Sequence, residues 1–279
     1  MKRCGLVAVI GETNAGKSTL INKMVGQKVS IVSRKAQTTL YKINGIAIHG
    51  ECQIIFMDTP GFSRVKHIES LAKIAWDTFR EADEVLFVVD VCKKKFDTTI
   101  ALLKRIHEAK RVSLVMNKID LIHKPKLLEI TKVFSEVRNF ENVFMVSGLT
   151  GSGVERILDF FSNYLPENEW IYDEDTVTDL SFEKYSSEIT REHIYHRLHE
   201  EIPYKCVVKT DDCQDQPDGS IRIVQTVYVK SETHRAIFLG HGGGKIKAIG
   251  AAARQELSTL LDKEVHLFLH VLISTQSNL

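Results

Sequence analysis

The octapeptide GETNAGKS, at residues 11–18, constrains the fold of this chain more than any other feature. It matches the pattern G-x-x-x-x-G-K-[ST], follows the apolar run Gly5–Ile10 and precedes a helical pattern at Lys17–Val25. In such a loop the glycines let backbone N–H groups curl around phosphate oxygens, the lysine reaches the terminal phosphates, and the last hydroxyl supplies an oxygen to Mg²⁺. The sequence therefore predicts a strand, a phosphate-binding loop (P-loop) and a helix, in this order.

Apolar runs and amphipathic stretches alternate along the first part of the chain. Strands are expected at Gly5–Ile10, Lys42–His49, Gln53–Asp58, Glu84–Asp90, Val112–Met116 and Val143–Val146. Helices are expected at Lys17–Val25, Ser70–Arg80, Thr98–Ala109, Lys126–Arg138 and Val154–Tyr164. This alternation is typical of an α/β domain whose mostly parallel sheet has helices on both faces. Ligands of such sheets bind beyond the carboxyl ends of the strands, so the chemistry is expected in the loops that follow them.

A different order of elements follows residue 164. The segment LPENEWIYDEDTVTDLS, residues 165–181, is acidic, contains a proline and lacks clean periodicity, so we interpret it as a linker. Beyond it the pattern predicts a helix, two strands joined by the turn QPDGS, a short segment, a glycine-rich loop, a long helix and a last strand. These elements are expected at Phe182–Glu200, Lys205–Thr210, Ile221–Val229, Ile246–Leu261 and Val265–Ile273. A length of 279 residues suits two domains, and we expect them at 1–164 and 182–279.

Composition is that of an ordinary globular protein and excludes a strong overall electrostatic signature. Hydrophobic residues make up 43%, charged residues 26%, and the net charge is +1, so any basic surface must be local. The five cysteines are odd in number and form no C-x-x-C pair, which favours free thiols in a reducing cytosol. No run reaches the roughly 18 apolar residues of a membrane-spanning helix. We therefore expect a cytoplasmic protein.

Two further segments are expected to complete the phosphate site. DTPG, at Asp58–Gly61, ends an apolar strand, where its carboxylate can hold Mg²⁺ through water and the Gly61 N–H can sense a terminal phosphate. The segment SRKAQTTL, at residues 33–40, lies between the P-loop and DTPG. Either Thr38 or Thr39 could close over Mg²⁺ and the terminal phosphate. The sequence does not choose between them, and we take Thr39 as the candidate.

Two motifs after later strands indicate that the base is guanine. The Asp120 carboxylate of NKID, at Asn117–Asp120, can accept hydrogen bonds from guanine N1–H and the 2-amino group. Adenine has an acceptor at N1 and no 2-amino group, and each unmatched buried polar group costs about 1–3 kcal/mol. VSG, at Val146–Gly148, follows another strand and can offer a backbone N–H to guanine O6. The motifs in this order resemble those of the translation-factor-related GTPases.

The residue after DTPG bears on how GTP would be hydrolysed. Ras-like enzymes place a glutamine there to orient water, whereas this chain has Phe62, which cannot do so. In this respect the chain resembles GTPases with a hydrophobic residue at that position, in several of which a P-loop asparagine coordinates K⁺. Our hypothesis is that Asn14 holds K⁺ against the β- and γ-phosphates and that intrinsic turnover is slow. The alternative is that Asn14 only braces the loop.

The glycine-rich stretch LGHGGGKIKAIG, at residues 239–250, does not fit a second nucleotide site. A second P-loop would need glycine in place of Leu239 and serine or threonine in place of Ile246, and G-x-G-x-x-G would need glycine in place of Lys245. What fits is G-x-x-G at Gly240–Gly243, followed by a lysine-bearing helix. In KH domains this loop clamps the backbone of about four nucleotides. The order helix–strand–strand–helix–helix–strand resembles a type II KH domain.

A P-loop GTPase joined to a C-terminal KH domain resembles one family in particular, the Era GTPases. The stretches that carry the resemblance are GQKVSIVSRKAQTT, DTPG, LPENEWIYDEDTVTDLS, EITREHIYHRLHEEIPY and GGKIKAIG. The resemblance implies an α/β P-loop GTPase domain plus an α+β type II KH domain, with Mg²⁺ as cofactor. It also implies binding to 16S ribosomal RNA near its 3′ end, assistance in maturation of 30S precursor particles, RNA binding that depends on the GTP state, and a monomer.

Several positions depart from the family pattern. Thr13 stands where the family has a P-loop proline, and Leu40 stands where it has an arginine. Gly148 replaces the usual alanine, which leaves a backbone contact to guanine intact. His241 and Gly242 fill a loop that in relatives carries polar residues and a lysine, so charge on the following helix matters more.

The expected site residues form four groups. The nucleotide contacts are Gly11, Glu12, Thr13, Asn14, Ala15, Gly16, Lys17, Ser18, Asp58, Thr59, Pro60, Gly61, Phe62, Asn117, Lys118, Asp120, Ser147 and Gly148. The expected catalytic residues are Asn14, Lys17, Thr39 and Gly61. The expected Mg²⁺ ligands are Ser18, Thr39 and Asp58, with K⁺ at Asn14. The expected RNA contacts are Gly240, His241, Gly242, Gly243, Lys245 and Lys247.

Two functions of different class fit these features. The first is an enzyme and assembly factor whose GTP turnover times its release from 30S precursors. The second is a GTP-gated RNA-binding regulator, associated peripherally with the inner membrane, in which hydrolysis is incidental. Phe62 is compatible with the second function, because it cannot orient water for hydrolysis. Asn14 and the intact DTPG favour the first function.

Two other charged stretches are interpreted as ordinary surface. CKKKFD, at residues 92–97, is expected to be a solvated loop. His193, His196 and His199 are spaced so that two of them could share a metal ion, but nothing completes a closed site. A solvated or partly packed helix face is the expectation there.

Overall fold

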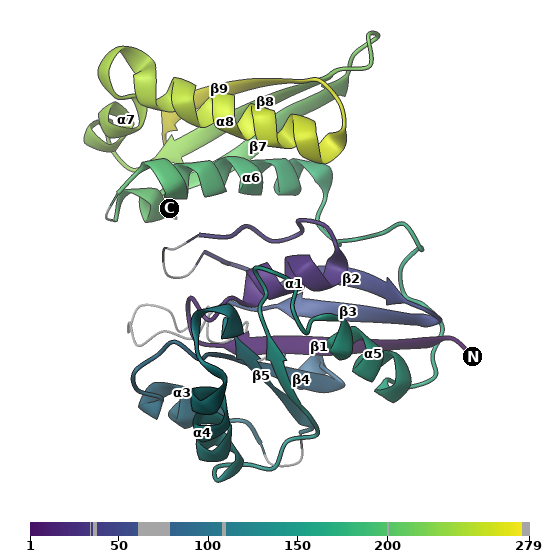
Figure 1. Cartoon of the computed structure of the whole chain (residues 1–279). Helices are drawn as coiled ribbons and strands as arrows, with labels where there is room; N and C mark the ends of the chain where they lie inside the picture. The colour runs from purple at the N-terminus through teal and green to yellow at the C-terminus, as the bar shows by residue number, and fades with distance from the viewer. Residues whose placement is uncertain (34, 36–37, 61–78, 108–109, 200, 275–279) are drawn as a thin grey trace. The chain divides into compact units, whose positions relative to one another are not determined.

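The computed structural model describes residues 1–279 except 34, 36–37, 61–78, 108–109, 200 and 275–279. The chain folds into two compact units, Met1–Asp179 and Leu180–Leu279 (Figure 1). The expected helix at Ser70–Arg80 lies almost wholly outside the described residues.

The first unit is built on a six-stranded sheet with the order β2-β3-β1-β4-β5-β6. Strand β2 runs antiparallel to β3, and every other neighbouring pair is parallel. The strands are β1 (Arg3–Gly11), β2 (Ile43–His49), β3 (Cys52–Asp58), β4 (Glu84–Asp90), β5 (Val112–Asn117) and β6 (Val143–Val146). Each corresponds to a strand expected from the apolar runs, because the interior of a parallel sheet is buried on both faces.

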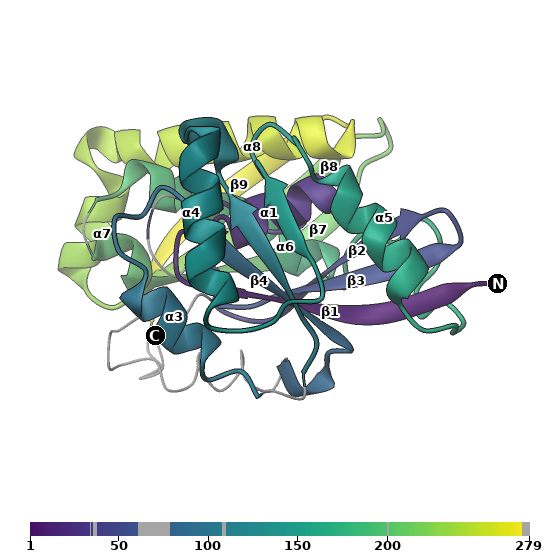
Figure 2. The same ribbon diagram turned by 60° about the horizontal axis from the view of Figure 1, so that its bottom comes forward.

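Helices cover both faces of this sheet. They are α1 (Lys17–Val25), α3 (Asp97–Leu103), α4 (Lys124–Ser135) and α5 (Glu155–Tyr164), with the short 3₁₀ helix η1 (Ile119–Leu121) after β5. Helices α1 and α5 pack on one face and α3 and α4 on the other (Figures 1 and 2). Strand alternation divides the apolar side chains between the two layers, so that Val7 and Val9 face α1 while Ala8 and Ile10 face α3. The α/β prediction for this unit is confirmed.

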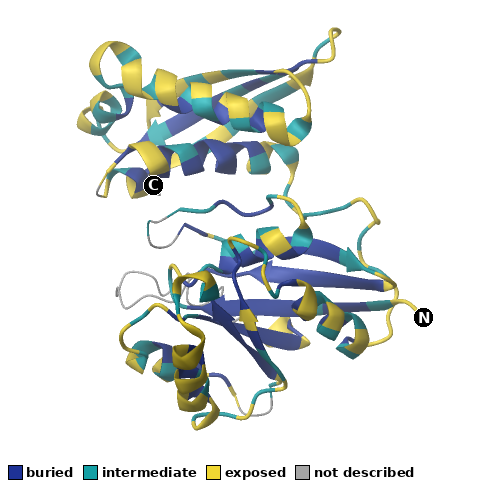
Figure 3. Ribbon diagram, viewed as in Figure 1, coloured by how far each residue is buried: buried dark blue, intermediate teal, exposed yellow. Residues whose placement is uncertain are grey.

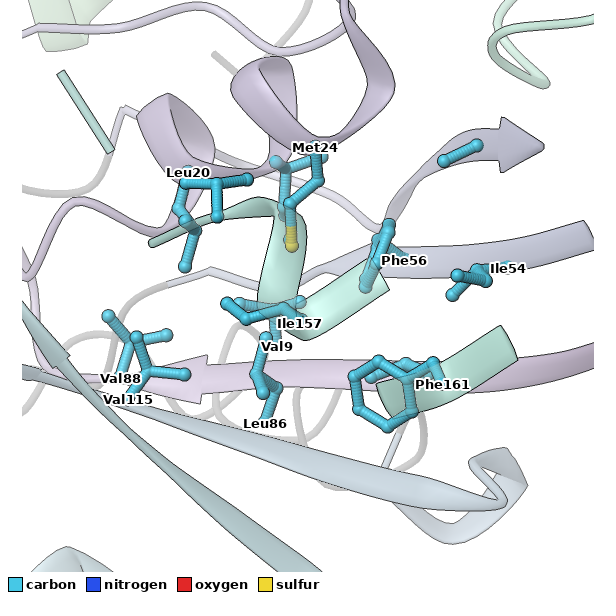
Figure 4. Close-up of a cluster of buried hydrophobic side chains, with 14 of the residues drawn as sticks. Val9, Leu20, Met24, Ile54, Phe56, Leu86, Val88, Val115, Ile157 and Phe161 are labelled. Atoms are coloured by element: carbon cyan, nitrogen blue, oxygen red, sulfur yellow. The ribbon is translucent and has the colours of Figure 1, made fainter. Parts of the chain in front are cut away.

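The layer under α1 and α5 closes around aromatic and branched side chains. Leu20 and Met24 of α1 belong to the same cluster as Phe56 of β3, and Phe161 of α5 lies edge-on to Phe56 with ring centroids 6.2 Å apart (Figure 4). Strands β3, β4 and β5 are buried along almost their whole length, whereas the outer helix faces are exposed (Figure 3). Burial of this kind is the main driving force for folding and holds the ends of β1, β3 and β5 in fixed positions.

Helix α3 is shorter than the expected Thr98–Ala109. It ends at Leu103, after which Arg105 and Ile106 make tighter i−3 hydrogen bonds to Leu102 and Leu103. This turn brings Ile106 into the core, where it is 2% exposed. The Arg138 guanidinium donates to the Ile106 carbonyl at 3.0 Å and so satisfies a carbonyl that a longer helix would have paired.

The acidic segment after α5 packs along the sheet of the first unit. The buried Gln53 side chain accepts hydrogen bonds from the Ile171 and Tyr172 N–H groups at 2.9 and 3.0 Å and donates to the Tyr172 carbonyl at 2.8 Å. Asn44 binds the Asp179 carboxylate through its backbone and side-chain nitrogens. The partners in these contacts belong to strands β2 and β3, far away in sequence. The composition of the segment alone could not reveal them and therefore indicated a linker.

The domain limits 1–164 and 182–279 stay a prediction.

The second unit is an α+β fold with a three-stranded sheet in the order β7-β8-β9. Strands β7 and β8 are antiparallel, and β8 and β9 are parallel. Its elements are α6 (Phe182–Arg197), η2 (Ile202–Lys205), β7 (Cys206–Asp215), β8 (Ile221–Val229), α7 (Glu232–Leu239), η3 (His241–Gly243), α8 (Gly244–Leu261) and β9 (Val265–Ile273). The order helix–strand–strand–helix–helix–strand is the one expected for a type II KH domain.

The core of the second unit lies between the helices and one face of this sheet. Ile249, Ala253 and Leu257 recur at helical spacing on α8 and are fully buried. Ile249 belongs with Phe238 of α7 and Val227 of β8 to one apolar cluster, in which all three side chains are fully buried. Because α8 is held along its length, the glycine loop at its first residue is held as well.

All five cysteines are free thiols, as expected. Burial raises the pKa of Cys206 to about 12, which keeps that thiol protonated and unreactive. Among the helices that the structure describes, none combines the length and apolar character needed to cross a membrane.

Candidate nucleotide site and nucleic-acid loop

The P-loop turns sharply between β1 and α1, and two of its glycines are required by close contacts. A Cβ at Gly11 would lie 2.4 Å from the Val88 carbonyl oxygen. Gly16 has φ +90°, and a Cβ there would lie 2.4 Å from Asn117 Nδ2. Asn14 also has a positive φ of +62°, a conformation that asparagine tolerates better than most residues. The loop is therefore a tight backbone cradle at the carboxyl end of β1.

Lys17 is drawn into this cradle from the first turn of α1. Its Nζ donates to the carbonyl oxygens of Gly11 at 3.2 Å and Glu12 at 3.1 Å. Burial lowers the pKa of Lys17 to about 8, while the nearby Asp58 carboxylate opposes the shift. A bound polyphosphate would add negative charge beside the ammonium and restore its preference for the charged form.

Three oxygen-bearing side chains from three distant segments meet beside Lys17. Ser18 Oγ donates to Asp58 Oδ2 at 2.7 Å, and Thr39 Oγ1 donates to the same oxygen at 3.3 Å. The two hydroxyl oxygens are 3.3 Å apart. Thr38 instead donates to the Lys35 carbonyl at 3.0 Å. Of the two threonines that the sequence left open, the structure brings Thr39 to Ser18 and Asp58.

This cluster has the chemistry that suits Mg²⁺. The ion prefers hard oxygen ligands and keeps several waters. Asp58 is fully buried, its Oδ1 has no hydrogen-bond partner within the described part of the chain, and burial raises its pKa. A buried carboxylate oxygen without a partner is costly unless a cation or water fills the position. The described residues contain no group of three or more histidine, cysteine, aspartate or glutamate side chains that could hold a metal. The Ser18 and Thr39 hydroxyls beside Asp58 would therefore supply the other ligand oxygens.

Asn117, at the end of β5, joins the P-loop to the two base-recognition loops. Its Nδ2 donates to the Ala15 carbonyl at 2.9 Å. Its Oδ1 accepts from the N–H groups of Lys118 at 2.8 Å and Gly148 at 2.9 Å. In this structure the Gly148 N–H, the expected donor to guanine O6, is thus paired with Asn117, and an O6 contact needs that bond to be shared or exchanged.

Lys118 and Asp120 follow in a strained turn. Lys118 has φ +70°, and its Nζ donates to the Asn14 carbonyl at 2.8 Å and to Asp90 Oδ2 at 2.6 Å. Asp120 lies in η1 with an exposed side chain, open to a ligand. The sequence analysis missed Asp90, although its position at the carboxyl end of β4 was a signal, because ligand-site residues gather at that edge of the sheet.

The loop after β6 packs closely on α1. A Cβ added at Gly148 would lie 3.2 Å from the Leu20 Cα, so the replacement of the family's alanine by glycine relieves a tight contact. Ser147 is fully buried, and its Oγ accepts from the Thr150 N–H at 3.1 Å. The structure places Gly148 beside the first turns of α1, and the predicted contact of its N–H with guanine O6 stays a prediction.

The remaining expected contacts divide into three kinds. Thr59 is buried and donates to the Val9 carbonyl at 2.9 Å, so its hydroxyl supports the sheet. The Glu12 carboxylate points to the α3 side, where Lys93 and Thr99 bind it. The expectation that residues 92–97 form a solvated loop is therefore wrong for Lys93. Gly61 and Phe62 lie outside the described residues.

One pocket brings the P-loop together with the segment that precedes β2. It is lined by Thr13, Asn14, Gly16, Lys17, Ser18, Thr19, Ile31, Val32, Ser33, Lys35, Thr38 and Thr39. Hydroxyls and the ammoniums of Lys17 and Lys35 dominate the lining, which is the composition expected for a polyphosphate and its metal ion.

The glycine loop of the second unit needs its glycines for backbone geometry. Gly240 has φ +69° and ψ −177°, a region essentially confined to glycine. Gly242 and Gly243 have φ +57° and +74°. A Cβ at Gly240 would lie 2.7 Å from Lys245 Cγ, so the stem of Lys245 lies directly against the loop. Within the described structure no side chain caps the N-terminus of α8, where the first backbone N–H groups of a helix have no partner inside the helix.

A groove between α8 and β9 continues from this loop. It is lined by Ile246, Lys247, Gly250, Ala251, Arg254, Leu267, Phe268 and Leu269. Two cations flank an apolar floor, and small residues on α8 allow close approach. The sequence analysis missed Arg254, although its spacing from Lys247 and Gly250 places all three on one helix face.

Within the residues that the structure describes, the histidines of α6 belong to no group that could hold a metal ion. His193 Nε2 is 2.7 Å from Glu256 Oε2, and Arg197 Nη1 donates to His193 Nδ1 at 3.1 Å. Both ring nitrogens of His193 are therefore engaged, in agreement with a packed helix face.

Fold and site together define the class of this protein: a P-loop GTPase domain joined to a KH domain. A family model described as "50S ribosome-binding GTPase" matches residues 6–118, and one described as "KH domain" matches residues 201–275. Similar curated proteins include GTPase Era of Sinorhizobium medicae, 46% identical over 96% of this chain and 88% of that protein. GTPase Era of Erythrobacter litoralis is 43% identical over 97% of this chain and 91% of that protein.

Solved structures agree with this assignment. Two Era structures align with a TM-score of 0.88 at 33% identity, covering 98% of this chain and 94% of theirs. One is a variant of Aquifex aeolicus Era bound to GDP·AlF4⁻, and the other is Era in complex with MgGDPNP and nucleotides 1506–1542 of 16S ribosomal RNA. The chain belongs to the Era family of GTPases.

Proposed function

We propose that this protein binds GTP with Mg²⁺, hydrolyses it to GDP and phosphate, and binds 16S ribosomal RNA near its 3′ end to assist maturation of the 30S subunit. The observation that carries the enzymatic part is the convergence of the Ser18 and Thr39 hydroxyls on the buried Asp58 carboxylate. These three groups come from the P-loop, the following segment and β3. A charged carboxylate is buried there at a cost that a metal ion and phosphate would offset.

Each part of the nucleotide has a matching group in the first unit. The backbone N–H groups of Gly11–Ser18 and the Lys17 ammonium would bind the phosphates, and Ser18 and Thr39 would bind Mg²⁺, with Asp58 acting through water. Asp120 would accept the guanine N1–H and 2-amino protons. Mg²⁺, when bound, supplies charge neutralisation between the β- and γ-phosphates.

We propose that hydrolysis depends on K⁺ held at Asn14. Asn14 has a positive φ, and its carbonyl is fixed by Lys118, so its side chain is presented from a rigid loop. A K⁺ ion there would supply the positive charge that an arginine finger supplies in other GTPases. GTP turnover is expected to be faster in KCl than in NaCl at equal ionic strength, and Asn14→Ala should abolish the difference. Equal rates in the two salts would rule out this role.

The RNA part rests on the second unit. The unprotected start of α8, the positive-φ glycines and Lys245 offer donors and charge to an RNA backbone. The groove between α8 and β9, with Lys247 and Arg254 at its edge, offers an apolar floor for bases. An Era protein of the same fold was solved with nucleotides 1506–1542 of 16S ribosomal RNA, which supports the same RNA region for this chain.

We further propose that the protein acts in the cytoplasm as a monomer and that any membrane association is peripheral.

The alternative function, a GTP-gated RNA-binding regulator at the membrane, makes a different prediction about GTP turnover. If the protein is an assembly factor, 30S precursors should stimulate GTP hydrolysis, and a non-hydrolysable analogue should trap the protein on them. If precursors neither stimulate nor trap it, the regulator is the better account.

A further inference from the structure

The loop after β4 reaches back to the P-loop through one lysine. Lys94 and Lys95 of this loop are exposed, but Lys93 is partly buried and pairs with the Glu12 carboxylate. Thr99, in the first turn of α3 and 2% exposed, donates to the same Glu12 oxygen at 2.9 Å. Two donors from one segment therefore bind a P-loop side chain.

Glu12 connects two sides of the P-loop. Its backbone carbonyl accepts from Lys17 at 3.1 Å and so faces the phosphate-binding ammonium. Its carboxylate, whose side chain is 12% exposed, faces α3 instead. The orientation of Glu12 is thus set by contacts on both sides, and a change at Lys93 would be transmitted to the residue that anchors Lys17.

The charges in this region balance in pairs. The Lys93 and Lys118 ammoniums lie close enough that Lys118, after the larger effect of burial, lowers the pKa of Lys93. Glu12 neutralises the first, and Asp90 neutralises the second at 2.6 Å. Without Lys93, the partly buried Glu12 carboxylate would keep the neutral Thr99 hydroxyl as a donor but would have no cationic partner, next to a site for negatively charged phosphates. Such like charges repel strongly where water is excluded.

We propose that Lys93 and Thr99 are positioning residues for the P-loop, which hold the Glu12 carboxylate on the α3 side, away from the phosphates. The inference rests on the proposed nucleotide-binding function and extends it to residues outside the nucleotide motifs. Because GTP carries more negative charge than GDP, the contribution of Lys93 is larger for GTP.

The test compares nucleotide affinities of Lys93→Met with those of a matched control, Lys94→Met. Both changes remove one lysine charge from the same loop, but Lys94 is exposed. Lys93→Met should bind a fluorescent GDP analogue roughly tenfold more weakly than the parent protein, and a GTP analogue more weakly still. Lys94→Met should bind both as the parent does. If the parent protein itself binds neither nucleotide, the proposed function fails and this inference fails with it.

A second variant separates positioning from direct contact. In Glu12→Gln/Lys93→Met the unpaired carboxylate is gone, so most of the lost affinity should return. If the double variant binds as weakly as Lys93→Met, Lys93 acts on the phosphates directly and the inference is wrong. Unchanged affinity in Lys93→Met would also overturn it. Should Lys93→Met not fold, Thr99→Val removes one donor to Glu12 with little change of shape, and a loss of roughly two- to fivefold is expected.

Discussion

At the scale of single residues, buried polar groups distinguish the functional site from the rest of the first unit. Asp58 is fully buried next to two hydroxyls and an ammonium, and every one of these groups lies at the carboxyl edge of the sheet. The motif residues themselves were predictable from the sequence, because a P-loop or NKID turn is defined by local spacing. The preference for Thr39 over Thr38 was not, since it depends on how the segment before β2 folds over α1.

The proposed role of Thr39 as a Mg²⁺ ligand can be tested with a single substitution. Thr39→Ala removes a hydroxyl from the proposed Mg²⁺ site and should weaken Mg²⁺-dependent binding of a GTP analogue by roughly tenfold, with less effect on GDP. Thr38→Ala should have the smaller effect, because that hydroxyl binds the Lys35 carbonyl. A Mg²⁺ titration of analogue binding measures both. A larger loss for Thr38→Ala would contradict the assignment.

Glu84 is a buried carboxyl at the other end of β4, away from the nucleotide site. It is 1% exposed, and burial, assisted by the Glu141 carboxylate, raises its pKa from 4.5 to about 7. The folded state therefore binds this proton more tightly than the unfolded state does. The contribution of Glu84 to stability is largest below about pH 4.5 and is lost as the pH rises through about 7.

Glu84→Gln should remove this pH dependence. We expect the variant to be more stable than the parent at pH 8, by on the order of 1–3 kcal/mol, and the difference to shrink at pH 5. Urea unfolding followed by tryptophan fluorescence measures it, because both tryptophans lie within residues 1–179. A constant difference between pH 5 and pH 8 would show that the carboxyl does not titrate in this range.

At the scale of secondary-structure elements, each unit contains a glycine loop that leads into a helix without a side-chain cap. In each unit a loop with positive-φ glycines leads into a helix that, in the described structure, has no side-chain cap: Gly16 before α1 and Gly243 before α8. Both helix starts offer free N–H groups to anions.

Strands buried on both faces were predicted to within a few residues because their apolar runs are unambiguous. The end of α3 and the packing of the segment after α5 were not, because Arg138, Gln53 and Asn44 act across long sequence separations.

Gly240 offers a test of the glycine loop with a control four residues away. Gly240→Ala forces a side chain onto a positive φ and against Lys245, so RNA affinity should fall by roughly tenfold or more, with a loss of stability of about 1–3 kcal/mol. Gly244→Ala places its methyl group in open space at a helical φ of −62° and should be neutral or slightly stabilising. Binding of a fluorescent 16S 3′-terminal RNA fragment compares the two. Equal affinities would show that the loop backbone does not clamp RNA.

At the scale of the whole molecule, the chain combines a guanine-nucleotide site in residues 1–179 with an RNA-binding surface in residues 180–279. A net charge of +1 means that the RNA affinity must come from local charge, and Lys245, Lys247 and Arg254, all on one helix, are the cations proposed to supply it. The sequence predicted that the two units bind different ligands, because the first contains the P-loop and the second contains the G-x-x-G loop. Asp90, Lys93 and Arg254 were not among the predicted site residues. The sequence held signals for Asp90 and Arg254, whereas the contact of Lys93 with Glu12 depends on how the loop after β4 folds back to the P-loop.

The central claim is that a nucleotide-bound form of this protein binds the 3′ region of 16S ribosomal RNA through the loop at residues 240–247. Crosslinking the full chain to total RNA, with a GTP analogue or GDP bound, tests it most directly. We predict crosslinks from this loop to the 3′ end of 16S RNA, and a yield that differs between the two nucleotides. Crosslinks that map elsewhere in the RNA, or that are absent from this loop, would contradict the account.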